Sequence, residues 1–428
     1  MKMSLFIMYL FSIFLFSCKK DSDALKPVIT ISIPSENAQY AIAEKITVTA
    51  TVSDESNIEY IMMQIIDENQ IAVTPQILSI PNEKKAFISN DFVIENNKLK
   101  SGDYYIYIRA FDGTNESSVR RKIYISEIPK YSKAIYVLTS PGQNQFDTHK
   151  VDSLYTTSLA FSHIGDCIGI EVNSNDNQVY TCGSLTGNLE ALTVTNHSMV
   201  WNSNNNGAGV PYFTAMHSAE NILYVGHYDG HISGYNKNGQ ITVNTTAGGN
   251  QYYPTKISAN NDLIFSEEKQ LVGQLKRLSV YYSSTGALKQ SVLFQADVVN
   301  MFFKDDNNTF IFANQNGQAK MYIYSVLQNT LWEPHTISGT IYAADRMDEN
   351  TYFISTSNSI YRYRYNTNSL FTLLFGTKSQ CLKYNEISDE IVVANSKSIN
   401  VYSNVTMNLT HTMVYSDSIN DIGILYNK

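Results

Sequence analysis

The chain has 428 residues, of which 43% are hydrophobic, and its formal net charge is −8. This hydrophobic content excludes a disordered chain, and the acidic balance argues against nucleic acid as a partner, because such binding depends on clustered Lys and Arg. The length exceeds what one hydrophobic core usually organises, so we expect several domains or a repetitive one. The 30 Tyr and 19 Phe residues favour strands over helices.

Residues 1–17 predict a signal peptide, because Lys2 supplies a positive charge and Leu5 to Phe16 form an apolar stretch too short to cross a bilayer comfortably. The following residue is Cys18. Residues 15–18, Leu-Phe-Ser-Cys, resemble a lipobox, the motif in which the cysteine receives diacylglycerol. The resemblance implies a lipidated Cys18 followed by a tether over residues 18–26. An ordinary secretory signal with a chance cysteine is the alternative.

The residues after Cys18 indicate a destination. Lys19 stands where, in the sorting rule for lipoproteins, an Asp would retain the protein in the inner membrane. Residues 19–23, Lys-Lys-Asp-Ser-Asp, resemble the charged tether of surface lipoproteins from Gram-negative glycan degraders. The resemblance implies a protein anchored in the outer membrane by lipid and displayed at the cell surface, with the periplasmic face as the alternative.

Residues 27–127 predict a β-sandwich, because apolar residues alternate along short segments, as at Ile29, Ile31 and Ile33. The predicted strands are 28–33, 46–52, 58–66, 86–94, 104–111 and 119–125, and the predicted turns are 34–37, 53–56 and 112–115. The segment resembles immunoglobulin-like and cadherin-like modules, notably through Arg109-Ala110-Phe111-Asp112-Gly113. The resemblance implies a spacer, and ligand binding is the alternative role.

Residues 131–428 contain a repeat in which three bulky residues precede one small residue. Its seven copies end at Thr139, Cys182, Gly226, Ser266, Ala313, Ser355 and Ala394. Their spacing of 39 to 47 residues is typical of the blades of a β-propeller, and each copy predicts the second strand of a four-stranded blade. No innermost strand precedes the first copy, so we expect residues 420–426 to supply it and close the ring.

This region resembles WD40-like and quinoprotein-like seven-bladed propellers, most closely over residues 224–232, Tyr-Val-Gly-His-Tyr-Asp-Gly-His-Ile. The Trp-Asp dipeptides of the first type and the blade-fastening Trp residues of the second are missing, since the chain has only Trp201 and Trp332. A fold does not carry a function with it, so no activity transfers. The predicted fold class is all-β, a β-sandwich followed by a seven-bladed β-propeller.

The predicted strand order divides the propeller loops between two rims. One rim is acidic, because the turns joining first to second strands contain residues 175–176, 220–221, 261–262, 305–306, 348–349 and 389–390. The opposite rim is rich in Tyr, Asn and Gly, and there we predict a ligand site formed by Tyr212, Tyr252, Tyr253, Asn206, Asn250, Gln251, His227 and Lys378. Aromatic rings and amides together are typical of sugar or peptide sites. Ordinary turn chemistry is the alternative for each single loop.

No pattern in the sequence predicts a catalytic residue, a metal or a cofactor. The GxSxG, HExxH and GxGxxG motifs and a phosphate loop are all missing. His227 and His231 bracket one hairpin turn, but a metal site needs ligands that converge. Cys167 and Cys182 flank a predicted hairpin, where they would form either a cross-strand bridge or two buried thiols.

The sequence therefore predicts a non-enzymatic binding or scaffold protein, anchored in the membrane by lipid, whose propeller rim meets a glycan, a peptide or a membrane-protein partner. One version of this prediction resembles the propeller lipoprotein of the outer-membrane barrel assembly machinery, which lacks the added sandwich. The alternative is a propeller enzyme such as a polysaccharide lyase or a quinoprotein-like dehydrogenase.

Overall fold

The computed structural model describes residues 25–142, 144–246 and 251–428. Its regular elements in those ranges are all strands, which confirms the all-β prediction. The same ranges hold no helix long and apolar enough to span a bilayer. The chain divides into two compact units, Met1–Pro129 and Lys130–Lys428. The predicted signal peptide, Cys18 and Asn250 lie outside the described residues.

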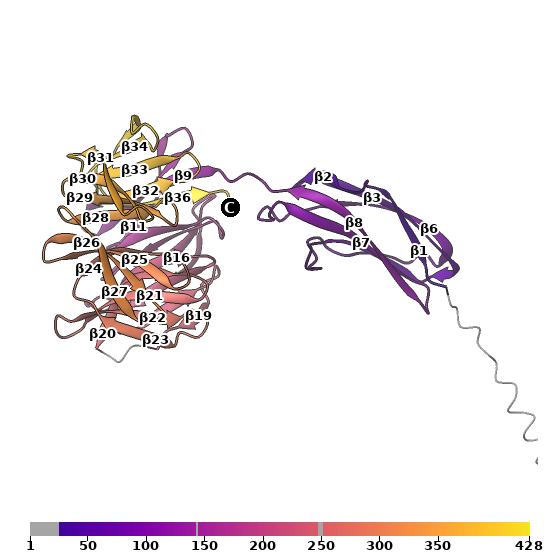
Figure 1. Ribbon diagram of the computed structural model, residues 1–428, viewed down its shortest axis with the longest axis horizontal. Helices are drawn as coiled ribbons and strands as arrows, with labels where there is room; N and C mark the ends of the chain where they lie inside the picture. The colour runs from indigo at the N-terminus through magenta and orange to yellow at the C-terminus, as the bar shows by residue number, and fades with distance from the viewer. Residues whose placement is uncertain (1–24, 143, 247–250) are drawn as a thin grey trace, which may run out of the picture. The chain divides into compact units, whose positions relative to one another are not determined.

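The first unit consists of two sheets (Figure 1). One contains β1 (Val28–Ile33), β3 (Lys45–Ile58) and β6 (Glu83–Val93); the other contains β2 (Ala38–Ala41), β8 (Glu116–Ser126), β7 (Gly102–Phe111), β4 (Tyr60–Ile66) and β5 (Ile77–Ser79). Alternate residues of both sheets enter one core, where Ile46, Val48, Ile106 and Ile108 are fully buried.

Two features of this unit differ from the sequence prediction. The turn predicted at residues 53–56 is wrong, because β3 continues to Ile58 through a bulge that lies between the pairs Ser53–Lys85 and Ile58–Glu83. A bulge leaves strand residues unpaired, so a polar cluster can sit within the strand. The short strands β2 and β5 were missed because three or four residues cannot display an alternation.

The described part of the second unit forms seven antiparallel sheets of four strands each. In chain order the first three are β9 (Ser132–Gly142), β10 (Gln145–Asp152), β11 (Thr157–Ile164) with β36 (Ser418–Tyr426); β12 (Gly169–Asn173), β13 (Gln178–Cys182), β14 (Leu189–Thr193), β15 (Met199–Ser203); and β16 (Phe213–Ala219), β17 (Ile222–His227), β18 (Ile232–Tyr235), β19 (Ile241–Asn244).

The other four sheets follow the same order from the innermost to the outermost strand. They are β20 (Tyr252–Ala259), β21 (Leu263–Gln270), β22 (Lys276–Tyr282), β23 (Leu288–Leu293); β24 (Asp297–Phe303), β25 (Asn308–Gln315), β26 (Gln318–Ser325), β27 (Thr330–Ile337); β28 (Ile341–Arg346), β29 (Thr351–Thr356), β30 (Ser359–Arg364), β31 (Ser369–Phe375); and β32 (Cys381–Asn385), β33 (Glu390–Asn395), β34 (Ser398–Ser403), β35 (Leu409–Val414).

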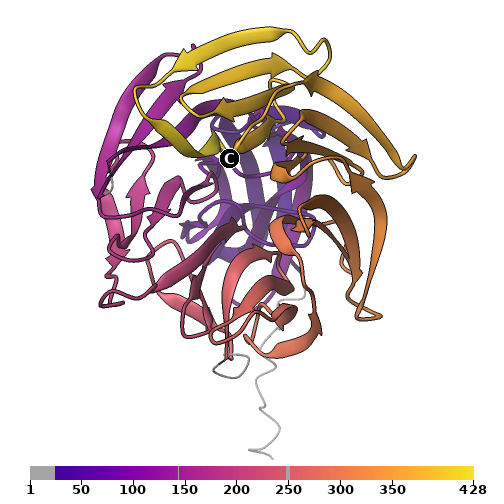
Figure 2. The ribbon, with the colours of Figure 1, turned by 90° about the vertical axis from the view of Figure 1, so that its left-hand side faces the viewer.

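These sheets are the blades of a closed seven-bladed β-propeller (Figure 2). Each innermost strand contacts the innermost strands of both neighbouring blades, from β12 round to β36 and back to β12. The strand β36 pairs with β9, for example at Ile422–Val137, and so supplies the innermost strand of the first blade. Small residues are needed where blades converge: a Cβ at Gly226 would lie 2.8 Å from Pro254 Cβ of the next blade.

The cysteines of the propeller are free thiols. Of the two alternatives for Cys167 and Cys182, the structure shows the unbridged one. Gly169 and not Cys167 pairs with Cys182, because β12 begins two residues later than the strand predicted at Cys167. Burial raises the pKa of the Cys182 thiol well above its usual value, so this thiol stays protonated and behaves as a small apolar side chain.

Candidate functional site

The propeller has two chemically different ends. The innermost strands finish at one end of the propeller, in turns that carry Asp176, Glu220 and Asp348, and we call this end the acidic rim. The aromatic rim is the opposite end, where the innermost strands begin. The predicted ligand residues that the structure describes, all of them except Asn250, belong to the aromatic rim.

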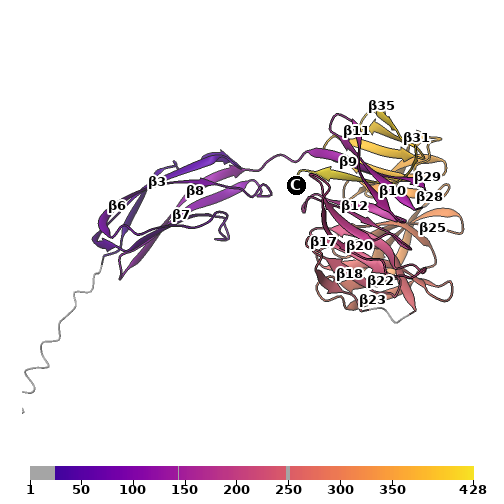
Figure 3. The same cartoon turned by 180° about the vertical axis from the view of Figure 1, so that it is seen from behind.

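An aromatic cluster lies on the aromatic rim where the third and fourth blades meet; β17 and β20 are side by side there (Figure 3). It consists of Tyr212, His227, Tyr228, His231 and Tyr253. The Tyr212 ring meets the His227 ring edge-on at 5.6 Å between centroids, His227 stacks on His231 at 4.1 Å, and Tyr228 lies 4.9 Å from Tyr253. The structure thus joins Tyr212 and His227 by a ring contact and places Tyr253 against Tyr228, the residue that follows His227.

His227 is a buried member of this cluster, with 5% of its surface exposed. Its Nε2 atom has no hydrogen-bond partner among the described residues. Burial and the neighbouring His231 lower the pKa of His227 to about 4, against the opposing effect of Asp229. The imidazole is therefore neutral at pH 7, and its role is to support the rings around it.

A cavity of about 340 Å³ borders the cluster, and Tyr253 lines it. The other lining residues are Lys269, Gln270, Gly273, Gln274, Leu275, Lys276 and Gln295. Asp297 forms ion pairs with both Lys269 and Lys276, which holds the two ammonium groups near the cavity wall. The cavity therefore combines one aromatic ring with amide and ammonium donors.

The remaining predicted residues do not join the cluster. Tyr252 and Tyr253 were predicted in a loop, but they are the first residues of β20, and the guanidinium carbon of Arg277 lies 4.1 Å from the Tyr252 ring centre. Lys378 lies on another blade, with its ammonium 4.2 Å from the ring centre of Tyr342. Asn206 and Gln251 are exposed in the segments that precede β16 and β20.

A second site, which the sequence analysis missed, follows the propeller axis. A cavity of about 630 Å³ opens at the acidic rim and a smaller one of about 210 Å³ adjoins it; both are lined by Glu171, His217 and Asn300. Each of the seven innermost strands contributes at least one polar side chain to these walls, and we name seven of them, one from each strand, the channel residues. These channel residues are Glu171, His217, Lys256, Asn300, Asp345, Lys383 and Asp421.

Opposite charges face one another across the channel. Burial opposes the charge on Lys383, but Asp345, Glu171 and Asp421 outweigh burial and raise the pKa of this ammonium. Burial raises the pKa of both Asp345 and Asp421, against the effect of Lys383. Backbone N–H groups fix the carboxylates: Tyr384 donates to Asp345 at 2.6 Å and Ile170 donates to Asp421 at 3.1 Å.

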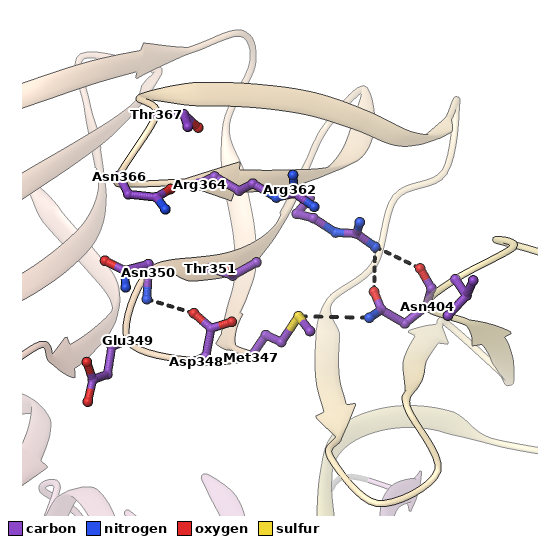
Figure 4. A pocket seen from close by; sticks show the side chains of 11 residues that line it. Met347, Asp348, Glu349, Asn350, Thr351, Arg362, Arg364, Asn366, Thr367 and Asn404 are labelled. Atoms are coloured by element: carbon purple, nitrogen blue, oxygen red, sulfur yellow. Dashed lines mark hydrogen bonds between the residues drawn. The ribbon is translucent and has the colours of Figure 1, made fainter.

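A groove of about 900 Å³ lies on the acidic rim between the sixth and seventh blades (Figure 4). Arg362 of β30 crosses to the next blade, where its guanidinium donates to the Asn404 carbonyl at 2.8 Å and to the Asn404 side chain. Met347 lines both this groove and the axial cavity. The two hollows therefore adjoin at Met347.

No family model and no curated protein matches the sequence. Among solved structures, the chain is similar to the WD40 β-propeller domain of Doa1, with 13% identity, a TM-score of 0.46, and coverage of 67% of this chain and 89% of that one. It is also similar to a chain of a nidogen/laminin complex (10% identity, TM-score 0.43, 70% and 100% covered) and to BamB from Moraxella catarrhalis (10%, 0.42, 68% and 93%).

Proposed function

We propose that this protein is a lipid-anchored, non-enzymatic binding protein of the outer-membrane surface, and that the aromatic rim of its propeller holds a glycan or peptide ligand. The supporting observation is that Tyr253 belongs both to the aromatic cluster and to the wall of the adjoining cavity. A tyrosine ring offers stacking area, and the amides of Gln270 and Gln295 offer hydrogen bonds, which is the usual chemistry of sugar and peptide sites.

The way in which the rings are held also favours binding. Tyr253 lies in β20 and His227 lies in β17, so sheet hydrogen bonds position both. Tyr212 is fixed through its backbone, since its carbonyl accepts the Tyr228 N–H at 3.0 Å and its N–H donates to the Ser184 carbonyl at 2.8 Å. A site that is rigid before the ligand arrives loses less entropy on binding. In this proposal the first unit acts as the spacer and Cys18 as the anchor.

The test is a glycan and peptide array probed with the full-length protein, purified in a detergent without a sugar headgroup. Tyr253→Ala and Tyr212→Ala should each weaken binding by about tenfold or more, while Tyr253→Phe, which keeps the ring, should bind nearly as well. Tyr282→Ala is the matched control, because it removes an exposed ring from the opposite end of the propeller, where β22 finishes at the acidic rim.

Two outcomes would contradict the proposal. A control variant that loses binding as strongly as Tyr253→Ala would show that the aromatic cluster has no special role. Conversion of a bound glycan to products would favour the propeller-enzyme alternative.

A further inference from the structure

We propose that the axial channel is a second ligand site and that it takes a neutral, polyhydroxylated molecule, a monosaccharide or a disaccharide. The channel opens at the acidic rim and shares no lining residue with the aromatic cluster or its cavity. This inference therefore stands without the proposal for the aromatic rim.

The channel is built by the whole ring of blades. The seven channel residues come from seven different strands, so the closed ring of blades fixes their mutual positions. Six of them are half-buried, and Lys256 is exposed. The wider cavity, at about 630 Å³, falls within the range of roughly 300–1,000 Å³ found for small-molecule sites.

Several channel residues have unused hydrogen-bonding capacity. The ammonium groups of Lys256 and Lys383 form no hydrogen bond or ion pair with any residue that the structure describes. Glu171 Oε1 lies 3.7 Å from His217 Nδ1, which is beyond hydrogen-bond length. These donors and acceptors border an open cavity, so a ligand that enters it can supply the partners that they lack.

The channel carries charges of both signs, and this balance selects the kind of ligand. Glu171, Asp345 and Asp421 line the channel together with Lys256 and Lys383, and Glu220, Glu386 and Arg346 add charges of both signs at its mouth. An organic cation would meet Lys383, and an anion would meet three carboxylates. A hydroxyl both donates and accepts, so a molecule with several hydroxyls can bridge the ammonium and the carboxylates at once.

The apolar part of the mouth fits the same ligand class. Phe302 and Tyr384 are half-buried and line the wider cavity together with the polar residues. The Tyr384 hydroxyl donates to Asp389 at 2.8 Å, and this bond holds the ring in place. A sugar presents a C–H face as well as hydroxyls, so one ligand can use both surfaces.

The experiment is isothermal titration calorimetry on the full-length protein in a detergent without a sugar headgroup. The probes are neutral hexoses, N-acetylhexosamines and disaccharides, with glycine, putrescine and acetate as zwitterionic, cationic and anionic comparators. A neutral saccharide should bind with one site per chain. Lys383→Met, Asp345→Asn and Glu171→Gln should each lower its affinity by about tenfold or more, because each removes a hydrogen bond to a charged group.

Lys289→Met is the matched control, because it makes the same charge change on the exposed face of the outermost strand β23. It should leave the affinity within about twofold of the parent, and so should Tyr253→Ala. Circular dichroism and the melting temperature check folding. If Lys383→Met does not fold, Glu171→Gln carries the test, because it changes no side-chain volume.

Three results would overturn the inference. The first is that no saccharide in the panel binds. The second is that saccharide binding persists in Lys383→Met and Glu171→Gln while Tyr253→Ala abolishes it, which would place the sugar on the aromatic rim. The third is tighter binding of glycine, putrescine or acetate, which would assign the channel to a charged ligand.

Discussion

At the scale of single residues, a buried ionic cluster explains why Tyr252 belongs to the scaffold of the aromatic rim. Glu268 is 1% exposed and accepts hydrogen bonds from Arg277 Nε at 2.7 Å, from Ser279 at 2.9 Å and from the Tyr281 hydroxyl. Three donors around one buried carboxylate compensate for its loss of hydration. Arg277 in turn covers the Tyr252 ring.

Glu268→Gln should destabilise the propeller strongly, because it leaves the Arg277 guanidinium without its anionic partner. The expected loss is about 3 kcal/mol in the free energy of unfolding, measured by urea denaturation of the propeller transition. Glu333→Gln is the control, since Glu333 pairs with Lys320 in a more solvated setting and should cost about 1 kcal/mol or less. Equal losses in the two variants would refute the role of burial.

His227 should make propeller stability depend on pH. Its pKa is about 4 in the folded protein, below the ordinary value of 6.5, so the unfolded chain binds a proton more readily. Stability from this residue is present above pH 6.5 and falls as the pH drops from 6.5 to 4, by roughly 3 kcal/mol in all. The buried neutral ring can be replaced by Phe.

His227→Phe should therefore flatten this pH dependence, measured as the difference from the parent in the free energy of unfolding at pH 7, 5.5 and 4. His335→Phe, on the outermost strand of another blade, is the control. An unchanged slope in His227→Phe would show that the burial of this imidazole does not govern acid stability.

Residue types alone could identify the aromatic cluster but not the channel. Tyr212 and Tyr253 follow segments rich in Asn and Gly, and these residues are typical of the turns that form the rim of a propeller. A Lys or Asp within an innermost strand, such as Lys383 between Leu382 and Tyr384, has the alternation of a solvent-facing position. This polar face of the strand points toward the propeller axis only because the ring of blades is closed. A local sequence pattern does not show that the ring closes.

At the scale of elements, the turn between β13 and β14 depends on a residue from outside both strands. Asp166 accepts backbone N–H bonds from Ser184, Leu185, Thr186 and Gly187 at 2.7–2.8 Å. Burial would raise the pKa of Asp166, but these four donors outweigh it and lower the pKa to about 2. The turn is thus organised around one carboxylate.

Asp166→Asn should lower the melting temperature of the propeller at pH 7, because an amide cannot accept four backbone bonds as an anion does. A loss of about 1–3 kcal/mol is expected. The difference from the parent should shrink as the pH falls from about 3.8 to 2, where the parent carboxylate is protonated. Asp152→Asn should have a smaller effect, because Asp152 accepts only two backbone bonds, both through Oδ1, and Asn keeps an oxygen that can accept them. A larger effect at Asp152 would contradict this account.

A strand could be predicted from the sequence most reliably where the propeller geometry restricts which residues fit. Every repeat copy ends within a second strand, because converging blades leave room there only for small residues such as Ala313 and Ser355. The last innermost strand was predicted to begin at residue 420, but β36 begins at Ser418, because a bulge between Ile419 and Asp421 interrupts the alternation. Bulges depend on tertiary packing, which a single strand does not reveal.

At the scale of the whole molecule, the anchor remains a prediction from the sequence. Cells grown with labelled palmitate should incorporate label into the parent protein and not into Cys18→Ala, which should instead be released in soluble form. Cys381→Ala is the control, because Cys381 is a buried free thiol of the propeller. Release is expected because each buried methylene of the acyl chains contributes about 0.8 kcal/mol to membrane attachment. Label that persists in Cys18→Ala would refute the anchor.

The pairing of β9 with β36 also orders assembly in time. The Tyr131 N–H bonds to Asn427 Oδ1 across 296 positions of sequence, whereas the other six blades are built from neighbouring segments. Six blades can therefore form while the chain is still being made. On β9, the backbone N–H and C=O groups that pair with β36 stay unpaired until residue 426 has been added. In an unfinished chain, this edge of β9 is therefore open to pairing with strands of other molecules.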